Sequence, residues 1–176
     1  LSATLTRDRR WQLLGVSPDQ QLSEAYPLLS ASGTPPTEIA CEPPPSKPVV
    51  VCFPSADTLI ESGLGRAQRG ECGLWIRNTV DEAQETFGQL KSANREGGPE
   101  IALLHSRFPQ FRREHLENDW MERLGKDGTR RPPNGCVLVS TQVAEQSVDI
   151  DADLLITDLA PTDMLLHRLG RLWRHE

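Results

Sequence analysis

Four nitrogen-rich side chains recur with helical spacing close to the end of the chain: His167, Arg168, Arg171 and Arg174. At 100° per residue they share one arc of a predicted helix. The opposite arc is apolar and holds Leu165, Leu166, Leu169, Leu172 and Trp173. Guanidinium groups bind phosphate bidentately, so the basic arc suits a phosphate ligand. Charge periodicity alone favours a simpler interpretation, a solvated helix face helped by the negative end of the helix dipole.

A second group of chemically useful residues follows an apolar run. Ser140 and Thr141 end that run, and three aspartates follow within 149–153. Small hydroxyl side chains and free backbone amides at a strand end can hold a nucleic-acid phosphate. Alternatively, the hydroxyl residues simply end the strand. An EF-hand calcium loop is excluded, because its sixth and twelfth positions require Gly and Glu, and here they are Leu154 and Ala160.

These residues must be positioned by an alternation of strands and helices. Apolar runs bounded by polar or turn residues predict strands, as in central parallel sheets. The predicted strands cover 49–53, 73–77, 101–104, 136–140 and 154–159, and the predicted helices cover 56–68, 79–91, 109–124 and 162 to the end. Thr79 and Glu82 form a predicted capping box. The pattern predicts an α/β fold, a parallel sheet with helices on both faces and ligands at the carboxyl ends of its strands.

Size and composition limit the class of protein. The 176 residues suffice for one domain and a tail. Repeated prolines predict a linker over 6–48, with the ordered domain at 49–176. No apolar run approaches the roughly 20 residues of a membrane span, so no membrane partner is expected. The net charge of -6 provides no overall attraction for nucleic acid, so such binding must be local.

The chain begins with Leu1 and shows no signal peptide, and it looks like part of something longer. Its four cysteines lack C-x-x-C spacing, which favours reduced thiols, a cytoplasmic location and no zinc site. The four histidines show no paired-ligand spacing beside aspartate, so no metal site is predicted.

Residues 167–174 resemble motif VI of superfamily two helicases, a [Q/H]-R-x-G-R-x-x-R pattern. The resemblance implies a RecA-like motor domain in which His167 and Arg171 contact ATP held by another domain. It implies that Arg174 is the arginine finger, a group worth about 10³ to 10⁵ in rate in GTPases. Residues 140–151 resemble motif V, which implies that Thr141 contacts the nucleic-acid backbone and that Asp149 serves the nucleotide side.

Further segments complete this order of motifs. Ser2, Ala3 and Thr4 resemble motif III, which couples the ATP state to nucleic acid, so residues 1–5 are expected to end a first motor domain. The segments 78–79 and 105–107 resemble nucleic-acid-contacting loops. The residues concerned are Asn78, Thr79, His105, Ser106 and Arg107. Without the resemblance, His105 and Arg107 would be interpreted as ordinary loop residues.

Segments 105–108, 143–151 and 170–175 together resemble the CRISPR-associated helicase-nuclease of type I interference systems. That family implies antiviral defence, recruitment to an RNA-guided surveillance complex, and 3′ to 5′ translocation on single-stranded DNA with ATP and magnesium. Two departures stand out. His167 resembles DEAD-box RNA helicases, which keeps an RNA helicase as an alternative, and Ser147 replaces the Gly of DEAD-box motif V, which weakens that alternative.

The chain contains no G-x-x-x-x-G-K-[ST] loop and no Asp-Glu pair before motif III. ATP and magnesium are therefore expected to bind mainly to the N-terminal motor domain of the same protein, and the chain alone is expected to be inactive. A non-catalytic nucleic-acid-binding module remains a further alternative.

Overall fold

The computed structural model describes residues 12–13, 28–29, 31, 34, 36–42, 46–126, 128–146 and 149–175. The chain divides into two compact units, Leu1–Val51 and Cys52–Glu176. In the first unit, β1 (Leu28–Leu29) pairs antiparallel with β2 (Thr37–Glu38). The predicted coupling residues Ser2, Ala3 and Thr4 lie outside the described residues. Across the described ranges, no helix has the length and apolar character of a membrane span.

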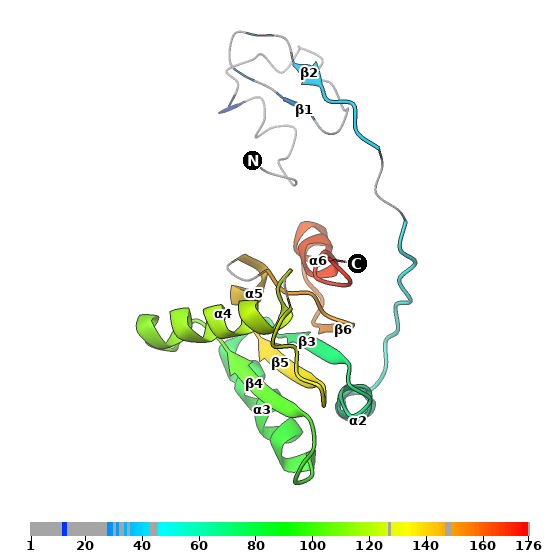
Figure 1. Ribbon diagram of the computed structural model, residues 1–176, viewed down its shortest axis with the longest axis vertical. Helices are drawn as coiled ribbons and strands as arrows, with labels where there is room; N and C mark the ends of the chain where they lie inside the picture. The colour runs from blue at the N-terminus through cyan, green and yellow to red at the C-terminus, as the bar shows by residue number, and fades with distance from the viewer. Residues whose placement is uncertain are drawn as a thin grey trace. The chain divides into compact units, whose positions relative to one another are not determined.

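The second unit is built on a four-stranded parallel sheet (Figure 1). Its strands are β3 (Cys72–Ile76), β4 (Glu100–Leu104), β5 (Cys136–Ser140) and β6 (Leu154–Thr157). They lie in the order β4-β5-β3-β6, with Trp75 of β3 paired to Val139 on one side and to Ile156 on the other. All pairings are parallel, so the carboxyl ends of the four strands meet at one edge.

Helices cover both faces of this sheet, which confirms the predicted fold class. The helices are α2 (Ala56–Ala67), α3 (Val80–Ala93), α4 (Gln110–Leu124), α5 (Val143–Gln146) and α6 (Thr162–Leu169). One face packs against α2 and α3, and the other packs against α4 and α5. Figure 1 shows α6 next to α5, on the side of the sheet opposite to α2 and α3.

The strands are apolar throughout because both of their faces are buried. Successive side chains of a strand point to opposite faces. In β3, Leu74 and Ile76 pack toward α4, whereas Trp75 packs toward α2 and α3. Every residue of β3 and β5 is buried. At the start of α3, Thr79 and Glu82 form the predicted capping box.

Two predictions about elements are wrong. Residues 49–53 do not form a strand; Val50 is 87% exposed and Phe53 is 84% exposed, and the segment lies outside the four-stranded sheet. An apolar run becomes a strand only when a neighbour supplies hydrogen bonds to its backbone. The last helix was predicted to run to the end of the chain, but α6 ends at Leu169. Beyond it, Leu172 instead forms a parallel bridge with Ala152.

Candidate functional site

The carboxyl edge of the sheet gathers residues that lie far apart in the sequence. His105 directly follows β4, Thr141 follows β5, and Asp158 follows β6. Arg77 and Asn78 follow β3. Because β4, β5 and β3 are neighbours, the sequence-predicted residues His105, Thr141 and Asn78 come from three adjacent strand ends. This edge is where ligands gather in open parallel α/β sheets.

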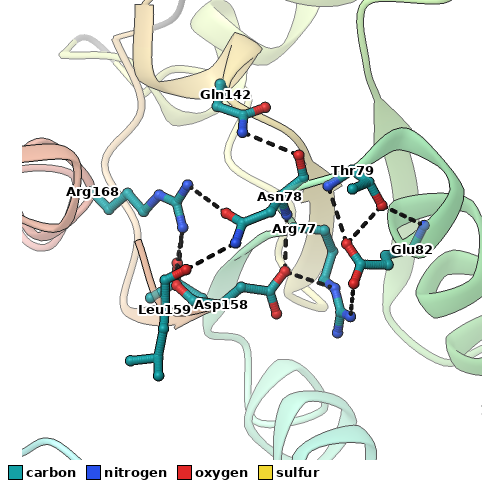
Figure 2. Close-up of polar contacts among 9 residues, drawn as sticks. Arg77, Asn78, Thr79, Glu82, Gln142, Asp158, Leu159 and Arg168 are labelled. Carbon is teal, nitrogen blue, oxygen red and sulfur yellow. Dashed lines mark hydrogen bonds and ion pairs between the residues drawn. The ribbon is translucent and has the colours of Figure 1, made fainter. Parts of the chain in front are cut away.

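Arg168 of α6 occupies the centre of this edge, and its side chain has no exposed surface. Its Nε donates to Glu145 Oε1 at 2.8 Å. One terminal nitrogen donates to Thr157 Oγ1 at 2.6 Å and to the Asp158 carbonyl at 3.1 Å, and the other donates to Asn78 Oδ1 at 3.1 Å (Figure 2). A single guanidinium group therefore ties the ends of β3 and β6 to α5.

Asn78, which accepts a hydrogen bond from Arg168, makes further hydrogen bonds to other strand ends (Figure 2). Its side-chain amide donates to the Leu159 carbonyl at 2.8 Å, and its backbone N–H donates to Asp158 Oδ2 at 2.9 Å. Its carbonyl accepts a hydrogen bond from Gln142 Nε2 at 3.1 Å. Since Arg168 and Leu159 occupy both ends of its side-chain amide, Asn78 acts here as a connector between strand ends.

Two ion pairs extend the network toward α3. Arg77 lies 3.2 Å from Asp158 Oδ2 and 3.5 Å from Glu82 Oε1. Glu82 in turn accepts from the Thr79 hydroxyl at 2.6 Å, and this hydrogen bond is the main reason that the pKa of Glu82 is lowered. The Thr79 side chain, predicted to contact nucleic acid, is thus engaged in capping α3 in this structure.

The prediction of which face of the last helix is exposed is wrong at Arg168. The helical-wheel pattern predicted Arg168 on an outward basic arc, with the leucines buried. In the structure Arg168 is fully buried, while Leu166 is 58% exposed. The reversal follows from Glu145, a 9% exposed acid on the adjacent α5, since a buried carboxylate requires a cationic partner.

A second cluster gathers three predicted nucleotide-side residues, Asp149, Arg171 and Arg174. Arg174 Nε lies 2.6 Å from Asp149 Oδ1, and an Arg171 terminal nitrogen lies 3.9 Å from the same oxygen. His175 Nε2 is 3.2 Å from the other carboxylate oxygen. These positions are brought together because the chain turns after α6 and bonds to Ala152 through the Arg171 carbonyl and the Trp173 N–H.

Arg171 and Arg174 differ in their surroundings. The Arg174 side chain is 43% exposed, whereas Arg171 is 8% exposed and donates to the Glu145 carbonyl. Arg171 Nε is buried and has no hydrogen-bond partner among the described residues. Burial, followed by the neighbouring Arg174 charge, lowers the pKa of Arg171. A buried donor that lacks a partner beside an exposed guanidinium suits an anionic ligand such as a phosphate. His167, the other predicted nucleotide-side residue, is exposed on α6.

The remaining predicted nucleic-acid residues differ in their exposure to solvent. His105 and Thr141 are each 3% exposed. The His105 ring stacks on Phe108 with 4.2 Å between centroids, and burial lowers the pKa of His105. By contrast, Ser106 and Arg107 are exposed, and Arg107 pairs with Asp81 at the start of α3. Of these four residues, only Ser106 and Arg107 are exposed to solvent.

Sequence reasoning missed the partners on which the edge depends. Glu145, Gln142 and Asp158 were not singled out, yet they hold Arg168, Asn78 and Arg77 in place. Gln142 and Glu145 lie close after the predicted strand 136–140, where polar residues are expected, whereas Asp158 lies within the predicted strand 154–159. Their pairings join residues as far apart as Arg77 and Asp158, and no local pattern in one sequence carries that information.

Comparison with known proteins places this geometry in a family. Residues 69–176 match the family model described as CRISPR-associated nuclease/helicase Cas3, C-terminal. The Cas3 endonuclease/helicase of Escherichia coli K12 is 37% identical over 99% of this chain. The Cas3 of Thermus thermophilus is 53% identical over 64% of it. The chain spans 21% and 12% of the lengths of these two relatives.

Solved structures agree with this match. The crystal structure of a CRISPR-associated protein is 35% identical to this chain with a TM-score of 0.74, and the match covers 96% of this chain and 19% of that protein's chain. T. fusca Cas3 with AMPPNP is 31% identical with a TM-score of 0.70, covering 95% and 22%. A CRISPR RNA-guided surveillance complex before nicking contains a chain with 35% identity and a TM-score of 0.59, covering 82% and 18%.

Proposed function

The chain belongs to the C-terminal family of CRISPR-associated Cas3 nuclease/helicases, and from this premise we propose that it is the second motor lobe of an ATP-driven DNA helicase. In this proposal Arg171 and Arg174 reach the phosphates of ATP, which binds together with magnesium mainly to the preceding motor domain of the same protein. The full-length protein translocates 3′ to 5′ on single-stranded DNA. It is recruited to an RNA-guided surveillance complex in the cytoplasm and serves antiviral defence.

The cluster of Arg171, Arg174 and Asp149 is the observation that carries this proposal. Two guanidinium groups share one carboxylate, so the cluster has one positive charge more than Asp149 can neutralise. Arg171 Nε is a buried donor with no partner among the described residues, and Arg174 is exposed. Such groups can neutralise charge on a departing terminal phosphoryl group. A related T. fusca Cas3 structure carries AMPPNP, which supports nucleotide use by this fold.

Hydrolysis of ATP, the transfer of its terminal phosphoryl group to water, drives movement in this proposal. The residues of this chain position charge around that phosphoryl group. Asp149 holds the Arg174 guanidinium at 2.6 Å when no phosphate competes for it. Arg171 is fixed by the Glu145 carbonyl, so its free Nε is oriented before a ligand arrives. Preorganised donors stabilise transition-state charge without further rearrangement. We therefore assign Arg174, the more exposed of the two, as the finger and Arg171 as a second phosphate ligand.

The three adjacent strand ends support the proposed nucleic-acid edge. Ser106 and Arg107 present exposed side chains there, and Asn78 and Thr141 shape the loops after β3 and β5. Contacts to phosphate and sugar carry no base information, as a motor that moves along any sequence requires. The side chains of His105, Asn78 and Thr79 bond within the chain and Thr141 is 3% exposed, so we assign these residues to shaping the loops of this edge.

The test uses the full-length protein and compares Arg174→Ala with Arg69→Ala, a control for losing an exposed arginine away from this cluster. We expect single-stranded DNA to stimulate ATP hydrolysis, and Arg174→Ala to lower the stimulated rate by about 10³-fold. Arg69→Ala should leave that rate unchanged. Full activity in Arg174→Ala would refute the assigned role.

Other outcomes separate the alternatives. Stimulation by single-stranded RNA in place of DNA would identify an RNA helicase, and DNA binding without any ATP turnover would identify a non-catalytic module. Duplexes with a single-stranded tail at either end test polarity, because a 3′ to 5′ motor unwinds only those with a 3′ tail.

A further inference from the structure

Two buried cysteines face each other at the amino ends of adjacent strands. Cys72 is the first residue of β3, Cys136 is the first residue of β5, and the parallel register pairs them directly. Both thiols have 0% exposure and join the same core cluster against α4. Neighbouring strands lie about 4.8 Å apart. That spacing is within the range of about 4.4–6.8 Å between Cα atoms that a disulfide spans.

A charged network surrounds one of the two thiols. Asp153 Oδ2 accepts from the Cys72 N–H at 2.7 Å and from an Arg131 terminal nitrogen at 2.6 Å. The Arg131 guanidinium therefore lies beside Cys72. A hydrogen bond from the Cys136 thiol lowers the pKa of Cys72; burial opposes this effect, and the charge of Arg131 adds to it. The same hydrogen bond, followed by burial, raises the pKa of Cys136.

We propose that Cys72 and Cys136 form a redox-modification site, a buried dithiol that a peroxide converts to a disulfide joining β3 to β5. The Cys72 thiolate attacks one peroxide oxygen, the O–O bond breaks, and the departing hydroxide takes up a proton to leave as water. The Cys136 sulfur then displaces the hydroxyl from Cys72, so an S–S bond forms and an S–O bond breaks. The Cys136 proton leaves with that hydroxyl as a second water, and both thiols are oxidised while the peroxide is reduced.

The position of Cys72 and Cys136 in the sheet explains how an oxidant reaches them and how a disulfide between them changes stability. Both residues begin their strands, so local opening of the amino ends, without global unfolding, admits a small oxidant. The candidate functional site lies at the carboxyl ends of the same strands, and the proposal does not depend on it. A Cys72–Cys136 bond closes the long loop that carries β4 and α4. Such a bond constrains the unfolded chain and raises stability.

The experiment uses the chain with Cys41→Ser and Cys52→Ser, two exposed positions, so that only the buried pair remains. The folded protein is treated with hydrogen peroxide, free thiols are then alkylated under denaturing conditions, and intact mass and peptide maps are recorded. We expect a mass lower by two hydrogen atoms, no alkylation, a cross-linked Cys72–Cys136 peptide, full reversal by dithiothreitol, and a higher urea midpoint.

Matched variants test the assigned roles of the two thiols and of Arg131. Adding Cys136→Ser should stop the reaction at a Cys72 sulfenic acid, which dimedone traps, whereas adding Cys72→Ser should leave Cys136 unlabelled. Arg131→Gln should slow disulfide formation several-fold, because it removes the cation that favours the thiolate.

Two results would overturn the proposal. One is that both thiols stay fully alkylatable under conditions that oxidise the exposed Cys41 of the parent chain. The other is that oxidation yields only links between molecules. Should the serine variants at the buried positions fail to fold, the two-cysteine protein still decides the matter, because its substitutions are confined to exposed sites.

Discussion

Truncating Glu145 should destabilise the fold far more than loss of a surface ion pair. The Arg168 side chain is 0% exposed and that of Glu145 is 6% exposed, and their atoms are 2.8 Å apart. Removing one partner of such a pair leaves an uncompensated buried charge and costs about 3–5 kcal/mol. Arg168 retains three neutral acceptors, Thr157 Oγ1, the Asp158 carbonyl and Asn78 Oδ1. We therefore expect a cost for Glu145→Ala near the lower limit, about 3 kcal/mol.

The assay is urea unfolding of the 176-residue chain, followed by tryptophan fluorescence and far-ultraviolet circular dichroism. With a urea m-value of about 1.5 kcal/mol/M, a loss of about 3 kcal/mol lowers the midpoint by about 2 M. Glu145→Gln keeps an acceptor of the same shape and should cost about 1.5 kcal/mol, the scale of a hydrogen bond to a charged group. Agreement between the two probes checks that unfolding remains two-state.

A double variant separates loss of the ion pair from loss of packing. Glu145→Leu with Arg168→Met replaces both charges by apolar groups. Its loss of stability should be much smaller than the sum of the losses in the two single variants, because the double variant leaves no charge unpaired whereas each single variant leaves one. The reasoning would be refuted if Glu145→Ala unfolded within about 0.5 kcal/mol of the parent, the scale of an ordinary surface substitution. Strict additivity in the double variant would refute it as well.

Three further predictions follow, two on backbone conformation and one on pH. Gly135→Ala should destabilise the chain by more than about 2 kcal/mol, since φ is +67° and a Cβ would lie 2.1 Å from the Ala67 carbonyl oxygen. Gly88→Ala, in open space within α3, should stabilise it by about 0.5–1 kcal/mol in the same urea titration. Burial lowers the folded-state pKa of His105 below 6.5, so the unfolded chain binds the proton more readily. The free energy of unfolding should therefore fall as pH drops below about 6.5. In unfolding curves collected from pH 8 to pH 5, His105→Gln should flatten this dependence on pH. An equally steep dependence in the variant would contradict the assignment to His105.

The sequence alone determined the fold class of the second unit and its four strands, because these features have local causes. Apolar runs bounded by polar residues predicted β3, β4, β5 and β6 to within a few residues of their observed ends. The capping box identified the start of α3, since its hydrogen bonds join residues three apart. The order of motifs likewise identified the family, because it depends on residue identities and not on packing.

Only the tertiary structure decided which polar groups are buried and with what partners. The same helical spacing placed Arg168 on an outward arc, but Glu145 and Asn78, from distant segments, bury it. The chain leaves the helix before Leu172 because Ala152 forms backbone hydrogen bonds with Arg171 and Trp173, on either side of it. Residues 49–53 remain exposed and do not join the sheet. Periodicity reports how a segment can present its side chains. Whether a face meets solvent, a carboxylate or another strand depends on residues elsewhere in the chain, so the environment of a charged group is decided only when the chain has folded.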